Sequence, residues 1–69
     1  MKAYRWYLYV GRRPIAFYGK LENAKQEAKR LSSRYDDTNA YRIVRMNEST
    51  VQKKTIGIYR NGIYRTALR

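Results

Sequence analysis

Apolar and polar residues alternate along the first part of the chain, residues 3–10, and these residues include several strong strand formers. In a strand, successive side chains point to opposite faces. One face would carry Tyr4, Trp6, Leu8 and Val10, and the other would carry Arg5, Tyr7 and Tyr9. The alternation therefore predicts a strand that is buried on one face.

A turn and a short returning strand follow this first strand. Residues 11–14 read Gly-Arg-Arg-Pro, which is the composition of a turn. Residues 15–18 predict a second strand, with Ile15 and Phe17 on one side. The two strands would form a hairpin that carries Arg12 and Arg13 at its tip.

The hydrophobic period changes at Leu21, where apolar residues begin to recur every three or four positions, as on one face of a helix. The members of this stripe are Leu21, Ala24, Ala28, Leu31 and Tyr35. The residues between them are good helix formers, and Glu27 can pair with Arg30 across one turn. Residues 36–39, Asp-Asp-Thr-Asn, would end the helix.

Three further strands are predicted after the helix, at residues 40–46, from the polar turn 47–50 to Arg60, and from Ile63 onward. Asn61 and Gly62 separate the last two, and this dipeptide favours the two positive φ angles of a type I′ hairpin turn. The predicted fold is a single α+β domain over residues 1–69, with a five-stranded antiparallel sheet in β-β-α-β-β-β order. One helix would cover one face of the sheet and leave the other face open.

The Asn-Gly turn also predicts the register of the last hairpin, with Arg60 opposite Ile63, Tyr59 opposite Tyr64, Ile58 opposite Arg65 and Gly57 opposite Thr66. Because the more apolar face of each strand should be the buried one, we expect the helix side to carry Ile56, Ile58, Ile63 and Ala67, together with Trp6, Leu8 and Val10. The open face would then carry Arg5, Tyr7, Tyr9, Tyr59 and Tyr64, with Tyr18 beside them. The strand at 40–46 is ambiguous, because Tyr41 and Ile43 compete with Val44 and Met46 for the buried face.

The charge of the chain is strongly positive. Sixteen of its 69 residues are Lys or Arg and five are Asp or Glu, which gives a formal net charge of +11. The predicted helical region, residues 21–39, carries four residues of each sign, so the strands and turns hold the excess. A neutral helix is a poor match to a basic amphipathic helix on a membrane. A small domain needs a charge of only about 2–8 for solubility, so +11 indicates an acidic partner.

The chain contains no His and no Cys. This excludes disulfides, the usual zinc ligands, and catalysis by Ser–His or Cys–His pairs, and we expect no metal and no cofactor. No apolar stretch approaches the ~20 residues of a membrane span, and Arg5, Arg12 and Arg13 interrupt any signal-peptide pattern. We therefore expect a cytoplasmic protein with no membrane contact.

A basic sheet face that carries aromatic rings suits nucleic acid, because bases stack on rings while Arg and Lys follow the phosphates. The predicted site comprises Arg5, Tyr7, Tyr9, Arg12, Arg13, Tyr18, Lys53, Lys54, Tyr59, Arg60, Tyr64 and Arg65. The sequence does not distinguish RNA from DNA, or single from double strands. Two alternatives stay open: the tyrosines are structural, as is common in strands, or the open face is a homodimer interface.

In outline the chain resembles small phage-encoded anti-CRISPR proteins. The shared features are the Met-Lys-Ala-Tyr start, Ala28-Lys29-Arg30 in a central helix, and a closing hairpin. The resemblance implies an alternative function, as an inhibitor that binds a host nucleoprotein complex and competes with or recruits nucleic acid there. No functional residue is carried over from it.

An enzymatic function is the third class. A small basic chain without His is similar to RelE-like messenger-RNA-cleaving toxins, but those usually begin with helices, whereas this chain is expected to begin with a hairpin. Glu48 and the tyrosines are the only candidate acid–base groups, and no motif pairs them with a group that would tune them. We therefore expect a protein that is not an enzyme.

Overall fold

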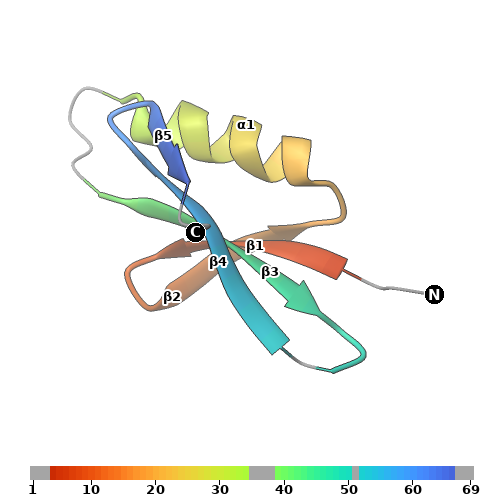
Figure 1. Ribbon diagram of the computed structural model, residues 1–69. Coiled ribbons are helices and arrows are strands. Elements are labelled where there is room, and N and C mark those ends of the chain that lie inside the picture. Colours follow the sequence, from red (N-terminus) through yellow and green to blue (C-terminus); the bar gives the residue numbers. More distant parts are fainter. Residues whose placement is uncertain (1–3, 35–38, 51, 67–69) are drawn as a thin grey trace.

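The computed structural model describes residues 4–34, 39–50 and 52–66, which form a five-stranded antiparallel sheet with one helix packed against it (Figure 1). The elements are β1 (Tyr4–Val10), β2 (Arg13–Tyr18), α1 (Leu21–Ser32), β3 (Tyr41–Asn47), β4 (Gln52–Arg60) and β5 (Ile63–Thr66). The strand order in the sheet is β2-β1-β3-β4-β5. The predicted α+β class, the order of elements along the chain and the antiparallel pairing are confirmed.

The core lies between the sheet and α1. Its buried members are Leu8, Ala24, Ala28, Tyr41, Ile43, Ile56 and Tyr59, and Trp6, Val10, Tyr18, Leu21, Leu31 and Tyr64 pack around them. The predicted helix-side face of β1 is confirmed. The ambiguity in β3 is resolved in favour of Tyr41 and Ile43, and Val44 lies on the opposite face, where it pairs with Tyr7 of β1.

Helix α1 lies close to the sheet because small residues occupy the centre of its apolar stripe. Ala24 and Ala28 are fully buried, as predicted, whereas Tyr35 lies outside the described residues. The end of the helix is tied to the last hairpin through Ser32, whose buried hydroxyl accepts a hydrogen bond from the Gly62 N–H at 3.2 Å. The helix and the β4–β5 turn are therefore held together by a polar contact as well as by packing.

The last hairpin has the predicted turn and register. Asn61 and Gly62 have φ angles of 54° and 76°, as a type I′ turn requires. Arg60 pairs with Ile63, and Tyr59 pairs with Tyr64.

The predicted orientation of this hairpin is wrong. Tyr59 and Tyr64 pack on the helix side with their ring centroids 4.8 Å apart, while Ile58 and Ile63 are 37% and 64% exposed on the other face. Of the isoleucines expected in the core, only Ile56 is there, and Ala67 lies outside the described residues.

A bulge in β4 explains the reversal. Ile43 of β3 pairs with Gly57 and the next residue, Val44, pairs with Thr55, so Ile56 is an extra residue in β4. An extra residue interrupts the two-residue alternation of a strand. Ile56 therefore faces the helix as predicted, but every position after it is on the face opposite to the one that simple alternation would give.

The position of Tyr18 is also a correction. It was expected on the open face, but it pairs with Trp6 and packs on the helix side. The preceding residue, Phe17, pairs with Tyr7 and takes the open face, so Tyr18 must point the other way. Burial raises the pKa of the Tyr18 phenol, as it does for Tyr59, which agrees with their place against the helix.

Candidate nucleic-acid interface

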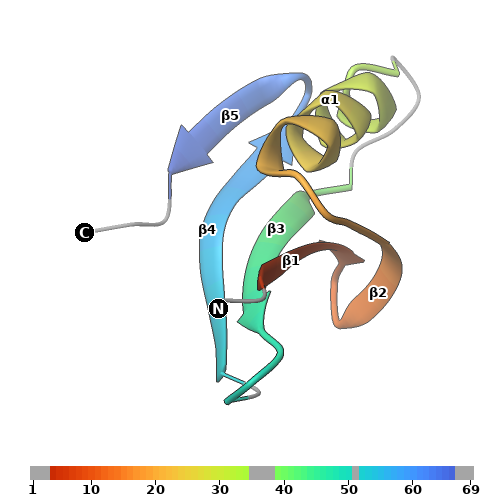
Figure 2. The ribbon, with the colours of Figure 1, turned by 90° about the vertical axis from the view of Figure 1, so that its right-hand side faces the viewer.

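We define the open face as the side of the sheet opposite α1 (Figure 2). Pairing between the strands arranges its side chains in rows that run across the sheet. One row contains Phe17, Tyr7, Val44 and Thr55, the next contains Pro14, Tyr9, Arg42, Ile58 and Arg65, and a third contains Arg5, Met46 and Lys53. The face is thus built from all five strands. Its aromatic residues lie on β1 and β2, and its cations, apart from Arg5 on β1, lie on β3, β4 and β5.

Each aromatic ring of the open face has a second ring or a guanidinium beside it. The rings of Tyr7 and Phe17 lie 5.5 Å apart between centroids and are tilted by 31°. The guanidinium of Arg5 lies 5.1 Å from the centroid of Phe17, and that of Arg42 lies 5.2 Å from the centroid of Tyr9. The two guanidinium distances are typical of cation–π contacts, which hold the guanidinium groups against the aromatic rings at the surface. Phe17 is nevertheless 55% exposed, so its ring is accessible to a ligand.

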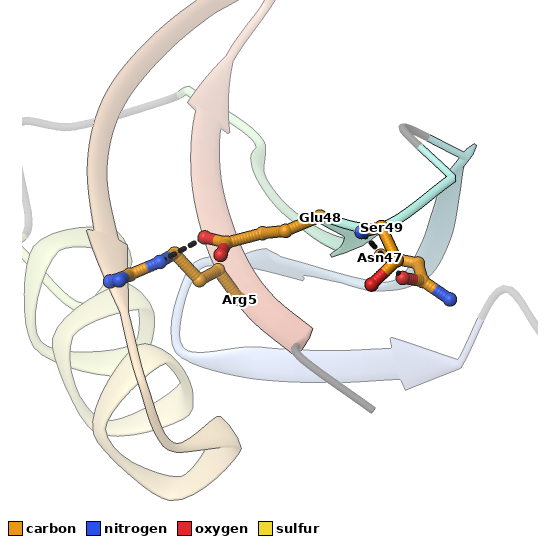
Figure 3. Close-up of polar contacts among 4 residues, drawn as sticks. All are labelled: Arg5, Asn47, Glu48 and Ser49. Atoms are coloured by element: carbon orange, nitrogen blue, oxygen red, sulfur yellow. Dashed lines mark hydrogen bonds and ion pairs between the residues drawn. The ribbon is translucent and has the colours of Figure 1, made fainter. Parts of the chain in front are cut away.

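Arg5 also forms an ion pair with Glu48, in the turn after β3 (Figure 3). That turn is shaped by Asn47, whose Oδ1 accepts a hydrogen bond from the Ser49 N–H at 3.0 Å. Both partners of the ion pair are partly exposed, so its contribution to stability is small. It places one carboxylate, that of Glu48, beside the cations of the open face.

Arg42 joins the open face to the β1–β2 turn. Its Nη2 donates a hydrogen bond to the carbonyl of Gly11 at 3.4 Å. Its Nε is buried and has no hydrogen-bond partner among the described residues. A buried donor without an acceptor costs about 1–3 kcal/mol. Arg42 is therefore held at a cost in stability.

Positive charge on the open face and on the β1–β2 turn is largely unneutralised. Among the described residues the structure contains two ion pairs, Arg5–Glu48 and Glu27–Arg30, and the second lies on the helix. Neither involves the other cations of the open face and the turn, which are Arg12, Arg13, Arg42, Lys53, Arg60 and Arg65. Such a surface attracts polyanions over a Debye length of ~10 Å.

The structure brings most of the predicted site residues to this surface. The residues on the open face by register are Arg5, Tyr7, Tyr9, Lys53, Arg60 and Arg65. Arg12 is exposed in the β1–β2 turn, whereas Arg13 is exposed at the start of β2, where it pairs with Val10 of the helix side. Lys54 is exposed but points to the opposite face, because it pairs with Arg45, which lies on the helix side of β3. Three of the predicted aromatic residues, Tyr18, Tyr59 and Tyr64, belong to the helix side instead.

Sequence reasoning missed two residues of the surface, Phe17 and Arg42. Phe17 could not be placed from the first turn, because a register counted from that turn puts it opposite Trp6, whereas the bulge at Ile15 in β2 pairs it with Tyr7. Arg42 could have been found by placing Tyr41 and Ile43 in the core, which puts the residue between them on the open face.

Comparisons with protein-family models, curated proteins and solved structures found no match to this chain. The resemblance to anti-CRISPR proteins therefore has no support from them. Within the described residues, no helix is long and apolar enough to cross a membrane. The same part of the chain contains no group of three or more Asp and Glu side chains that could hold a metal ion.

Proposed function

We propose that the protein is a non-enzymatic module that binds nucleic acid through the open face and the Arg12–Arg13 turn. One observation carries the proposal: the exposed ring of Phe17 and the half-buried rings of Tyr7 and Tyr9 have guanidinium groups or other rings beside them. Apart from Arg5, the cations around them form no ion pair among the described residues. Bases can stack on Phe17, Tyr7 and Tyr9, at about 1–3 kcal/mol per base. The arginines and lysines around them can follow the phosphates.

The charge of the open face favours a nucleic acid over a second copy of the chain. A two-fold dimer on this face would bring the net positive charge of one copy's open face against the same net charge of the other. Juxtaposed like charges cost several kcal/mol at an interface. A polyanion neutralises these charges, whereas a homodimer would add to their repulsion.

The proposal is tested by measuring the affinity for labelled oligonucleotides by fluorescence anisotropy at rising salt. Affinity should fall steeply, since log K changes with log salt by about −0.7 per neutralised phosphate for single strands and about −0.9 for a duplex. Phe17→Ala should weaken binding by about 1–3 kcal/mol, the worth of one stacked base.

Phe17→Leu is the matched variant, because it keeps an exposed apolar side chain and removes only the ring. It should bind as weakly as Phe17→Ala. Binding of the wild-type chain that does not change with salt, or two Phe17 variants that bind like wild type, would count against the proposal.

The exposed aliphatic residues of β4 and β5 favour a second candidate, a contact with protein. Ile58 and Ile63, with Arg60 and Arg65, line a surface hollow of about 400 Å³. Aliphatic side chains offer no stacking surface to a base, but they are suited to an apolar partner. This fits the alternative of an inhibitor that binds a host nucleoprotein complex.

The two candidates are separated by a pull-down from nuclease-treated host lysate with the wild-type chain and with Ile63→Asp. A protein partner should survive the nuclease and be lost with Ile63→Asp. A partner that disappears with nuclease in both cases would support binding to nucleic acid alone.

A further inference from the structure

A second basic hollow lies on the helix side of the sheet, where α1 does not reach. Figures 1 and 2 both show the β3–β4 turn extending away from the helix. Two rows of side chains cross β1, β3 and β4 at this end of the sheet. The first row contains Trp6, Arg45 and Lys54, and the next contains Tyr4, Asn47 and Gln52. The hollow has a volume of about 350 Å³, and we call it the helix-side pocket. Its lining residues are Tyr4, Arg45, Asn47, Gln52, Lys53 and Lys54.

The helix-side pocket contains two cations that repel each other, Arg45 and Lys54, and the ring of Tyr4 orients the first of them. Arg45 stands directly opposite Lys54, and like charges in that position destabilise a sheet. Neither takes part in an ion pair among the described residues. The Arg45 guanidinium lies 4.9 Å from the centroid of the Tyr4 ring, which orients it. An anion between the two cations would replace their repulsion by attraction.

The neighbouring amides add hydrogen-bonding groups to this pocket. The Oδ1 atom of Asn47 is engaged by the Ser49 N–H, which leaves its amide NH₂ group as a donor. Gln52 pairs with Asn47 across the strands and offers a second amide. Two cations and two amides around one hollow are suited to the oxygens of a phosphate group.

The pocket shares two lining residues with a hollow on the open face, at the edge of β4. A hollow of about 250 Å³ on the open face is lined by Tyr9, Arg42, Val44 and Thr55, and by the same two residues, Lys53 and Lys54. Strand β5 pairs with β4 only over residues 57–60. Among the described residues, the first half of β4 therefore has no strand on its outer side, and its edge separates the two hollows.

We propose, on the basis of the proposed function, that the ligand is a single-stranded nucleic acid that crosses the edge of β4 at Lys53 and Lys54 and places a phosphate in the helix-side pocket. The protein measures only 23 × 20 Å across its short axes. A duplex has a persistence length of about 150 base pairs and does not bend around an edge of that size. A single strand bends at every nucleotide and can contact both faces.

The test compares wild-type protein with Arg45→Gln/Lys54→Gln, which removes two charges from the pocket. Lys20→Gln/Lys29→Gln is the matched control, since both of its residues are exposed cations at the start and on the outer face of α1. Affinities are measured for single strands of about 4, 8 and 16 nucleotides, the usual range of single-strand sites, and for a duplex of the longest sequence.

The pocket variant should lose about tenfold in affinity for the longest single strand and less than about twofold for the shortest, which cannot reach both faces. Its salt slope for the longest strand should fall by about 0.7, the value for the one phosphate in the pocket. The control should lose less than about twofold throughout. Circular dichroism should show both variants folded, and Lys54→Gln alone replaces the pocket variant if it is not.

The possible failures are distinguishable. If the longest single strand binds but the pocket and control variants behave alike, or if the duplex binds as tightly as the single strand, the inferred path is wrong and the proposed function stands. If wild-type protein binds none of the oligonucleotides, the proposed function fails, and this inference fails with it.

Discussion

Gly57 lies at the position where the bulged strand and the tyrosine pair meet, and we predict that Gly57→Ala destabilises the fold through Tyr64. A Cβ atom at position 57 would overlap the Cε1, Cζ and hydroxyl oxygen atoms of Tyr64. The ring would have to leave its place. It now lies 4.8 Å from the Tyr59 ring and under the Lys25 ammonium at 4.6 Å, and its hydroxyl donates to the Ile56 carbonyl at 3.2 Å.

The size of the effect follows from these contacts. The ring pair contributes about 0.5–1.5 kcal/mol, the hydrogen bond about 0.5–1.5 kcal/mol and the cation–π contact about 0.5–1 kcal/mol. Replacing glycine in a compatible backbone returns about 0.4–1 kcal/mol, because the unfolded chain loses entropy. The net expectation is a loss of about 1–3 kcal/mol, from a total of about 3–10 kcal/mol for a chain of this length.

Thermal and urea unfolding, followed by circular dichroism, measure this loss. A change of 1 kcal/mol lowers the melting temperature by about 4–8 °C in a domain of this size. Gly19→Ala is the matched control, because a Cβ at that position has no atom within 4 Å, and it should be neutral or slightly stabilising.

The decisive comparison is Gly57→Ala in a Tyr64→Ala background, where the overlap is absent and the substitution should no longer destabilise. An equal loss of stability in both backgrounds would refute the explanation.

Three further predictions concern single side chains. Ser32→Ala should lower the free energy of unfolding by about 1 kcal/mol in urea titrations, because the Gly62 N–H loses its acceptor, whereas Ser33→Ala, at an exposed hydroxyl, should cost less than about 0.5 kcal/mol. Arg42→Met should change stability by less than about 1 kcal/mol, since the removal of a buried donor without a partner offsets the loss of the hydrogen bond to Gly11 and of the contact with Tyr9. The salt slope of single-strand binding should nevertheless fall by about 0.7, and an unchanged slope would remove this side chain from the interface. Burial raises the pKa of Tyr59, so its stabilising contribution is constant below about pH 10, the ordinary value for tyrosine, and is lost as the pH rises through the higher folded value. Tyr59→Phe should therefore show a smaller fall in stability than wild type between neutral and strongly alkaline pH, and identical pH profiles would contradict this.

The parts of the fold that the sequence predicted well depend on local chemistry. The Asn61-Gly62 turn and the hairpin register follow from the φ angles that two residues can adopt. The helix follows from the spacing of its apolar stripe, and the buried face of β1 follows from strict alternation with Trp6 and Leu8 on one side. In each case the signal lies within a few neighbouring residues.

The orientation of the last hairpin could not be derived in this way, because it depends on pairing between strands that are distant in sequence. Apolar weight favoured Ile58 and Ile63 for the core, but the extra residue in β4 places tyrosines there. Gly57 was the available signal, since a glycine inside a strand often marks a bulge or the close approach of another group. The Arg5–Glu48 ion pair was equally hidden, because its partners are 43 residues apart.

The positive charge and the location of the candidate site were predicted, but several of its residues were not. Its positive charge and its location opposite the helix followed from counting charges along the chain and from the single helix available to cover the sheet. Its aromatic members changed, because Phe17 and the tyrosines of β1 lie there while Tyr18 lies against the helix. The difference arose at the bulges in β2 and β4, where one extra residue reverses the faces that simple alternation would give.

The extra residue in β4 also determines how the strand would respond to a change in its length. A deletion of Ile56 would let Thr55 and Gly57 follow each other opposite Val44 and Ile43, so the ladder would become regular while Tyr59 stayed against the helix and Ile58 stayed exposed. The loss would be confined to the Ile56 side chain, which is part of the core. A relative one residue shorter at this point would therefore present the same exterior around a smaller core.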